Sequence, residues 1–340
     1  MYRRGDSSSV LLVGVYVDDL IITGASPEGI EGFKAEMKKL FQMSDLGLLS
    51  HYLGIEVHQD DDAITLCQAH YAESILELAG MAGCNAVQTP MEERLKLSRK
   101  STAPEVDATH YRRLVGSLRY LVHTRPDLAF AVGYVSRFME HPTEEHLQAV
   151  KRILRYVAGT LSFGLCYKRR TGAARLVGYS DSELAGDIDT RKSTSGNLFF
   201  LGNCLISWQS IKQRVVALSS CEAEYVAATT AATQAIWLAR LLSELTGEDA
   251  QTVELKMDSK SALELAKNPV FHERSKHIEL RYHFIRSCLD NGRINATFIP
   301  TAEQLADILT KALGRVKFQE LRSRIGMVQV SRSQGLGGEC

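Results

Sequence analysis

The stretch Gly178-Tyr179-Ser180-Asp181-Ser182 ends a short apolar strand, expected over residues 176–180, and the elements after it decide the fold of the second half. Hydrophobic periodicity places the following elements in order: strands over 197–201 and 204–208, a long helix over 219–245, a strand over 252–257, helices over 259–267 and 278–290, a strand over 294–299 and a helix over 303–313. This order predicts an α/β domain in which a mixed sheet is flanked by helices.

Two acids follow strands of this expected sheet. Asp181 ends the first strand, and Asp258 ends the strand over 252–257. Two adjacent strands would bring these carboxylates within reach of a shared ion. Taken singly, each has a plainer interpretation that stays open, because Asp181 fits a turn and Asp258 fits a helix N-cap.

The long helix carries two further acids, Glu222 and Glu224, which lie about 200° apart around its axis. Glu224 begins an apolar stripe consisting of Ala228, Ala231, Ala235, Leu238, Leu242 and Leu245. Glu222 begins a more polar face consisting of Tyr225, Thr229, Thr233, Arg240 and Glu244. A carboxylate on an apolar stripe is costly without a partner, so Glu224 is the expected metal ligand and Glu222 is expected to be solvated.

A fourth acid, Asp307, lies in the expected helix over 303–313 and is weak evidence alone. Two-metal hydrolysis of a phosphodiester needs several carboxylates at one place, because the two ions sit only about 4 Å apart. Hard oxygen ligands suit Mg²⁺. The set Asp181, Glu224, Asp258 and Asp307 meets this requirement for two Mg²⁺ ions, with Mn²⁺ as the other candidate.

The first half begins with an apolar stretch over 10–17, then Asp18-Asp19, then 20–22, which predicts two short strands joined by an acidic turn. Further along, the sequence predicts helices over 29–43, 71–82, 111–121, 126–138 and 143–158, and a hairpin formed by 53–57 and 64–67. The expected domains are 1–90, 91–170, 171–315 and a C-terminal tail over 316–340.

Composition excludes several classes of protein. Lys plus Arg and Asp plus Glu each number 40, so net charge says nothing about a polyanionic partner. Seven scattered Cys without a Cys-x-x-Cys pair suggest neither a disulfide framework nor a zinc site. No apolar run reaches the ~18 residues of a membrane span, and no secretion signal is evident. We therefore expect an intracellular protein, cytoplasmic or nuclear, with no membrane partner.

Residues 175–313 resemble the ribonuclease H domain of Ty1/copia-type retrotransposon polyproteins. The segments that carry the resemblance are Gly178-Tyr179-Ser180-Asp181, Thr190-Arg191-Lys192-Ser193-Thr194-Ser195-Gly196, Ser219-Ser220-Cys221-Glu222-Ala223-Glu224-Tyr225, Met257-Asp258-Ser259, Lys276-His277-Ile278, Arg281-Tyr282-His283-Phe284-Ile285-Arg286 and Gln304-Leu305-Ala306-Asp307-Ile308-Leu309-Thr310-Lys311. The resemblance implies a ribonuclease H-like, mixed five-stranded sheet. It also implies Mg²⁺-dependent cleavage of the RNA strand of RNA–DNA hybrids, with Asp181, Glu224, Asp258 and Asp307 as the metal ligands.

One departure from this family concerns histidine. Many ribonucleases H carry a His-containing loop before the last acid, and Pro300-Thr301-Ala302-Glu303 leaves no room for one. His277, or alternatively His283, is the candidate proton shuttle. Both also fit as surface or structural histidines on their helix.

The first half resembles the same polyprotein. Tyr16-Val17-Asp18-Asp19 is similar to the palm motif of reverse transcriptases, in which paired aspartates hold catalytic Mg²⁺. The other matching segments are Phe41-Gln42-Met43-Ser44-Asp45-Leu46-Gly47, Tyr52-Leu53-Gly54-Ile55-Glu56-Val57, Val115-Gly116-Ser117-Leu118-Arg119-Tyr120-Leu121 and Thr124-Arg125-Pro126-Asp127. They imply a partial palm followed by a helical thumb/connection. About fifteen residues precede Tyr16, so we expect a fragment that lacks the fingers and a third palm carboxylate and cannot polymerise without the missing portion.

Binding of a hybrid would rest on phosphate contacts from basic residues. The candidates are Arg191, Lys192, Lys212 and Arg214 near the sheet, with Lys151, Arg152 and Arg155 on the preceding helix. Each also fits an ordinary solvated face. Three hypotheses remain open: an active ribonuclease H, an inactive retroelement remnant that only binds nucleic acid, and a different two-metal nuclease such as an integrase or resolvase. The detailed local matches count against the third.

Overall fold

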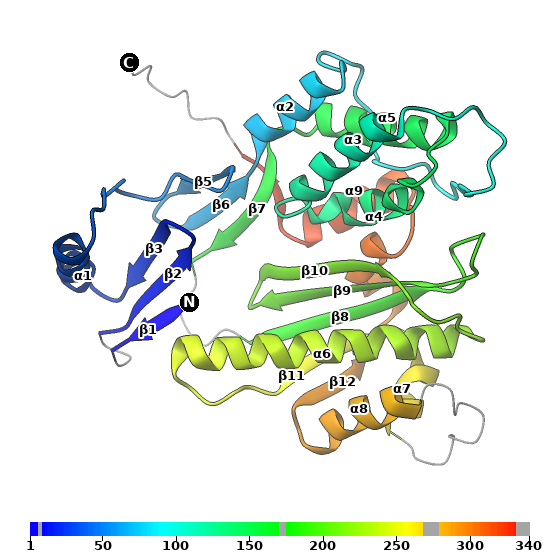
Figure 1. Ribbon diagram of the computed structural model, residues 1–340. Helices are drawn as coiled ribbons and strands as arrows, with labels where there is room; N and C mark the ends of the chain where they lie inside the picture. The colour runs from blue at the N-terminus through cyan, green and yellow to red at the C-terminus, as the bar shows by residue number, and fades with distance from the viewer. Residues whose placement is uncertain (6–8, 170–174, 268–278, 331–340) are drawn as a thin grey trace.

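The computed structural model describes residues 1–5, 9–169, 175–267 and 279–330, and for residues 279–283 it describes the backbone only. Among these residues the strands form three sheets, shown in Figure 1. A central mixed sheet lies between a layer made mainly of helices from the first half and the helices α6 (Ser220–Thr246), α7 (Lys260–Lys267) and α8 (Glu279–Asp290) of the second half. A second, antiparallel sheet and a small N-terminal sheet lie beside these layers, on the left in Figure 1.

The central sheet has the strand order β10-β9-β8-β11-β12. Its strands are β8 (Leu176–Glu183), β9 (Thr194–Leu201), β10 (Cys204–Lys212), β11 (Val253–Met257) and β12 (Ile294–Phe298). The first three are antiparallel, whereas β11 runs parallel to both β8 and β12. The expectation of a mixed α/β sheet is confirmed. Because Met257 pairs with Ser180, the residues that follow them, Asp258 and Asp181, lie side by side at one edge.

One face of this sheet is covered by α6 (Ser220–Thr246), α7 (Lys260–Lys267) and α8 (Glu279–Asp290). The stripe of α6 that begins at Glu224 packs against the sheet as expected, and its alanines allow a close approach of helix and strand. The helix ends at Gly247, whose left-handed φ of 76° suits glycine.

The opposite face of the sheet packs on helices of the first half, and one hydrophobic core joins the two. The helical elements of the first half are α2 (Ala69–Leu78), α3 (Ala108–Leu121), η1 (Pro126–Leu128), α4 (Ala129–Val135), η2 (Ser136–Phe138) and α5 (Glu144–Ala158). The second half adds η5 (Thr301–Glu303), η6 (Leu305–Leu309) and α9 (Arg315–Arg324). The single helix expected over 126–138 is thus one short α-helix between two 3₁₀ turns. None of the described helices is long and apolar enough to span a membrane.

A second five-stranded sheet has the order β13-β7-β6-β5-β4 and is antiparallel throughout. Its strands are β4 (His51–Tyr52), β5 (Ile55–Gln59), β6 (Ala63–Cys67), β7 (Phe163–Lys168) and β13 (Met327–Gln329). The sequence predicted neither β7 nor any element in the C-terminal tail. The tail assignment over 316–340 is too long, because α9 and β13 bury Phe318, Leu321 and Met327 in the core of the helical layer.

The N-terminal sheet consists of β1 (Tyr2–Arg4), β2 (Leu11–Tyr16) and β3 (Asp19–Gly24), followed by α1 (Pro27–Leu40). The predicted acidic turn is present, since Tyr16 pairs with Asp19 and Val17 takes a φ of 51°. Helix α1 buries no residue. This region leaves large apolar side chains exposed, among them Tyr16, Val17, Leu40, Phe41, Leu46 and Leu48.

A fully buried ion pair lies in the core of the helical layer. Both Arg125 Nε and Nη2 donate to the carboxylate of Asp127, at 2.9 and 2.8 Å. The Arg125 guanidinium also donates to the carbonyl and hydroxyl of Thr160, and the Tyr156 hydroxyl donates to Asp127 at 2.7 Å. Burial alone raises the pKa of Asp127, but Arg125 and these hydrogen bonds hold it below its usual range.

Candidate active site

Three acids from three elements meet at the edge of the central sheet. Asp181 lies on β8, Asp258 follows β11, and Glu224 lies in the second turn of α6. One carboxylate oxygen from each lies within 4.8 Å of the others. The parallel pairing of β8 and β11 accounts for the two aspartates, and the packing of α6 on β8 brings in the glutamate.

Glu224 is buried, and its two carboxylate oxygens differ in environment. Oε1 accepts a hydrogen bond from the backbone amide of Ser182 at 3.1 Å. Oε2 is buried with no hydrogen-bond partner among the residues that the structure describes. Burial raises the pKa of Glu224 to about 9, and the neighbouring Asp181 and Asp258 add to this shift. An orphaned carboxylate oxygen facing two other acids fits a divalent cation with oxygen ligands.

Asp307 lies beside this group without joining the three-acid cluster. It is on the 3₁₀ turn η6, so the helix expected over 303–313 is wrong. Gly196 permits the close approach of η6 to β9, because a Cβ there would lie 2.8 Å from Leu309 Cβ. Burial and the Asp181 charge raise the pKa of Asp307 to about 7.

A cation of the chain itself lies among these acids. Lys311 Nζ is 2.7 Å from Asp307 Oδ1 and 3.7 Å from Asp181 Oδ2. Burial lowers the pKa of Lys311, but the acids around it, Asp181 first, hold the pKa above its usual range. The Thr310 hydroxyl donates to Asp181 Oδ2 as well. Both residues hold Asp181 in place from η6 and the segment after it.

Sequence reasoning missed a positioning residue, Gln304. Its side chain is fully buried, and its amide donates to the Ser180 carbonyl at 2.8 Å and to Asp258 Oδ1 at 3.3 Å. Gln304 thereby connects the β8 residue that precedes Asp181 with the side chain of Asp258 at the end of β11. A neutral residue between two short turns gives no charge or periodicity signal, so only its place in the Gln304–Lys311 motif could have marked it.

The expectation that Glu222 is solvated is wrong, since only 7% of the residue is exposed. Glu222 is the third residue of α6, and its carboxylate folds back to accept from the Leu218 amide at 2.8 Å. The Ser219 hydroxyl accepts from the Glu222 amide in return. This arrangement is close to a capping box, which explains a buried acid at the start of the helix. Tyr225 and Thr229 on the same face are buried too.

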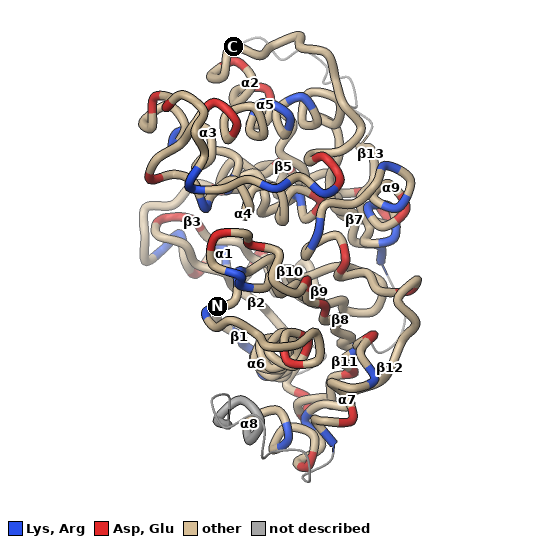
Figure 2. Tube along the Cα trace, turned by 90° about the vertical axis from the view of Figure 1, so that its right-hand side faces the viewer, with Lys and Arg blue, Asp and Glu red and all other residues tan. Residues whose placement is uncertain are grey.

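The basic candidates differ in their surroundings. Arg191 and Arg214 are exposed, and Lys192 is half-buried. Lys212 Nζ lies 2.7 Å from Asp187 Oδ2, which also accepts from Arg137. On α5, Lys151 pairs with Glu144, Arg152 pairs with Glu92, and Arg155 donates to the Asn85 carbonyl. In Figure 2, basic and acidic segments are interspersed over the trace.

The aspartate pair expected for a polymerase palm and the candidate histidines complete the residues named from the sequence. Asp18 and Asp19 lie exposed at the β2–β3 turn, and no metal-binding cluster of three residues within the described ranges includes them. His277 lies outside the described residues, and so does the side chain of His283.

Comparison with known proteins agrees with this fold. Residues 1–93 match the family model of the reverse transcriptase (RNA-dependent DNA polymerase). The retrovirus-related Pol polyprotein from transposon TNT 1-94 of Nicotiana tabacum is 41% identical over 335 residues, which cover 96% of this chain and 25% of that protein. A putative transposon Ty5-1 protein of Saccharomyces cerevisiae is 33% identical over 234 residues, which cover 67% of this chain and 75% of that protein.

Among solved structures, the foamy viral protease-reverse transcriptase dRH in complex with double-stranded DNA shares the fold, with a TM-score of 0.51 and 14% sequence identity. The match covers 85% of this chain and 46% of that one. The family match of residues 1–93 and the transposon relatives together place the chain among the proteins of retroelements. More narrowly, the chain belongs to the Pol polyproteins of Ty1/copia-type retrotransposons. It spans about a quarter of the length of the tobacco relative.

Proposed function

We propose that the second half of this chain is a ribonuclease H that hydrolyses the RNA strand of RNA–DNA hybrids with Mg²⁺. The observation that carries the proposal is the convergence of Asp181, Glu224 and Asp258 within 4.8 Å, with Glu224 Oε2 orphaned. The strand order β10-β9-β8-β11-β12 and the covering helix α6 support a ribonuclease H-like arrangement.

Each acid has a distinct role in this proposal. Asp181, Glu224 and Asp258 would hold the ions, and Asp307 would complete the ligand set from η6. Bound Mg²⁺ would supply charge stabilisation at the phosphate and an activated water. Lys311 neutralises Asp181 and Asp307 when no ion is bound, and it must yield part of that contact when one is. Gln304 orients Asp258 through its side-chain amide.

The N-terminal region, in our proposal, is part of a polymerase palm. Asp18 and Asp19 at the β2–β3 turn correspond to its metal-binding pair, and no third carboxylate among the described residues joins them, so polymerisation would need carboxylates and nucleotide-binding elements from elsewhere. The large apolar side chains exposed around this turn and α1 are consistent with a surface that packs against another protein segment. Primer extension by this chain alone would contradict the proposal.

Cleavage of a labelled RNA–DNA hybrid by the full chain tests the nuclease directly. We expect RNA cleavage with Mg²⁺, none after chelation, and a loss of at least ~100-fold in Asp258→Asn, because losing even one preorganised electrostatic group costs about 10²–10³ in rate. Asp189→Asn is a matched control, since Asp189 contacts Ser98 and Arg99 away from the cluster. Equal rates in the wild type and Asp258→Asn would favour the alternative of an inactive remnant that only binds nucleic acid.

Two basic residues on and after β10 differ in their expected roles: the exposed Arg214 is expected to bind the hybrid, and Lys212 is expected to support the structure through Asp187. In an Asp258→Asn background, Arg214→Gln is expected to weaken hybrid binding and to flatten the slope of log affinity against log salt by about 0.7–0.9. Lys212→Gln removes one of the two cationic partners of Asp187, so it should lower the free energy of unfolding and leave the slope nearly unchanged. Fluorescence anisotropy at several salt concentrations measures both slopes. A larger change for Lys212→Gln than for Arg214→Gln would contradict this assignment.

A further inference from the structure

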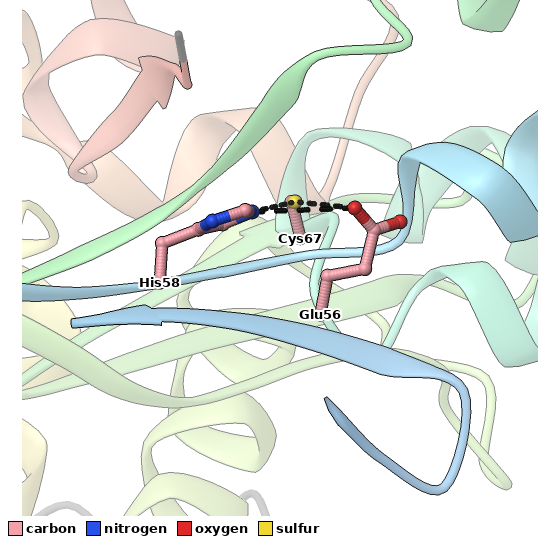
Figure 3. Close-up of side chains that lie close together, drawn as sticks. All are labelled: Glu56, His58 and Cys67. Atoms are coloured by element: carbon pink, nitrogen blue, oxygen red, sulfur yellow. Dashed lines mark hydrogen bonds and ion pairs between the residues drawn. The ribbon is translucent and has the colours of Figure 1, made fainter. Parts of the chain in front are cut away.

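A second cluster of ligand-type side chains lies on the β5–β6 hairpin, far along the chain from the acids. Glu56 and Cys67 are directly opposite one another across the two strands. His58 is two residues beyond Glu56, and alternate residues of a strand point to the same face of the sheet. The three side chains therefore point to one place, as Figure 3 shows.

The distances within this cluster resemble those of a metal site. The Cys67 Sγ lies 3.7 Å from Glu56 Oε2 and 3.7 Å from His58 Nε2, and the last two atoms are 4.0 Å apart. Bonds of 2.0–2.3 Å in a tetrahedral site place donor atoms about 3.3–3.6 Å apart. Closing the remaining gap needs a movement of roughly half an ångström. The His58 side chain is 41% exposed and can make that movement.

The surroundings orient the carboxylate of Glu56. Its Oε1 accepts a hydrogen bond from the backbone amide of His70 at 2.8 Å, at the start of α2. This contact leaves Oε2 directed at the thiol and the imidazole. Cys67 is buried, with 2% of its surface exposed, whereas His58 opens to solvent. A water molecule can thus take a fourth position on the exposed side.

The chemistry of the three donors selects the class of ion. Thiolate and imidazole are ligands for borderline and soft transition ions, and they are poor ligands for Mg²⁺. A thiolate and a carboxylate together neutralise a divalent cation, so a bound ion would bury no net charge. The burial of Cys67 argues against a role as an exposed nucleophile.

We propose that Glu56, His58 and Cys67 bind a divalent transition ion of the Zn²⁺ type, separate from the Mg²⁺ site of the nuclease. On binding, the Sγ–H bond of Cys67 breaks, a sulfur–metal bond forms, and the proton is released to the buffer. The ion fastens β5 to β6 and to the start of α2. The sequence suggested no zinc site, because it has no Cys-x-x-Cys pair, but the pairing of β5 with β6 brings the three ligand-type residues together.

Co²⁺ is the probe that tests the proposal in the full chain. Chelator-treated protein in excess Mg²⁺, which occupies the carboxylates, is titrated with Co²⁺ and followed by absorption. We expect a thiolate-to-cobalt charge-transfer band that saturates at one equivalent and disappears when Zn²⁺ is added. Cys67→Ser should abolish the band. His58→Gln should weaken Co²⁺ binding more than ~10-fold, since even outer partners of metal ligands are worth about 10–100-fold.

Two matched variants serve as controls. Cys221→Ser removes the thiol beside Glu224, and His70→Gln changes a side chain that is 94% exposed while keeping the backbone amide that Glu56 accepts from. Both should keep the band. Absence of the band in the wild type, its persistence in Cys67→Ser, or its loss in Cys221→Ser would each overturn the proposal. If Cys67→Ser fails to fold by circular dichroism, an unchanged affinity in His58→Gln overturns it instead.

Discussion

Replacing Glu224 with glutamine is expected to stabilise the metal-free protein while abolishing hydrolysis of the hybrid. The wild-type carboxylate is buried beside Asp181 and Asp258, and one of its oxygens is orphaned. With its pKa raised to about 9, Glu224 must take up a proton when the metal-free protein folds at pH 7, and a neutral amide of the same size removes that cost. At pH 7 we expect the free energy of unfolding without metal to rise by about 2–3 kcal/mol. Urea denaturation in the presence of a chelator measures this change.

The effect has a defined pH dependence. The pKa of Glu224 is raised to about 9 in the folded protein, so the folded state binds a proton more tightly than the unfolded state does. The stability of the metal-free wild type should therefore fall as pH rises from the unfolded pKa, about 4.3, towards 9. Asp307, whose pKa is raised to about 7, also lowers the stability of the metal-free protein as pH rises, but between its unfolded pKa of 3.8 and about 7. Glu224→Gln should flatten this decline.

Added Mg²⁺ and a neighbouring glutamate provide the controls. Mg²⁺ should stabilise the wild type more than Glu224→Gln, because only the wild type has the full ligand set. Glu222→Gln, two residues away, keeps an acceptor for the Leu218 amide and should neither raise stability nor abolish hydrolysis. A Glu224→Gln protein that is less stable than the wild type without metal would contradict the assignment of Glu224 as a ligand held ready for an ion.

Replacing Arg125 with alanine is expected to cost about 3–5 kcal/mol of the free energy of unfolding. The substitution leaves Asp127 charged, fully buried and without its guanidinium partner, and it strips the Thr160 carbonyl of a donor. Chemical denaturation by urea measures the loss. Arg113→Ala on the exposed face of α3 is a matched control that should cost little.

The paired replacement distinguishes a lost charge partner from lost packing. Arg125→Leu combined with Asp127→Leu removes both charges, so it should recover much of the stability lost in Arg125→Ala. A double variant that is no more stable than Arg125→Ala would show that shape and hydrogen bonding at Tyr156 and Thr160 matter more than charge.

Local pattern in the sequence was enough to predict much of the candidate site. Asp258 follows β11 as expected, whereas Asp181 lies within β8, which continues to Glu183, so the expectation that Asp181 ends its strand is wrong. The parallel pairing of β8 and β11 nevertheless places the two acids side by side. Glu224 was chosen over Glu222 by the angle between them on the helix, and the buried stripe below Glu224 supports that choice. The acidic β2–β3 turn followed from two apolar runs separated by Asp18-Asp19.

What escaped prediction depends on contacts between distant segments. Glu222 is buried by a capping interaction that a helical wheel does not represent. Strand β7 has only six residues and is stabilised by pairing with β6 and β13, both far from it in sequence. Asp307 shares an apolar run with Ile308 and Leu309 that looks helical, yet packing against β9 winds it into a 3₁₀ turn.

The pairing of β13 with β7 also affects how the chain is assembled during translation. Residues 176–309, which hold the central sheet, are inserted between the two segments that complete the antiparallel sheet and the helical core. The core around α2–α5 lacks Phe318, Leu321 and Met327 until α9 and β13 leave the ribosome. The inserted sheet is complete earlier in synthesis, so the central sheet can fold before the half that precedes it. Such long-range closure is slow, and it leaves the earlier half exposed to misfolding in the meantime.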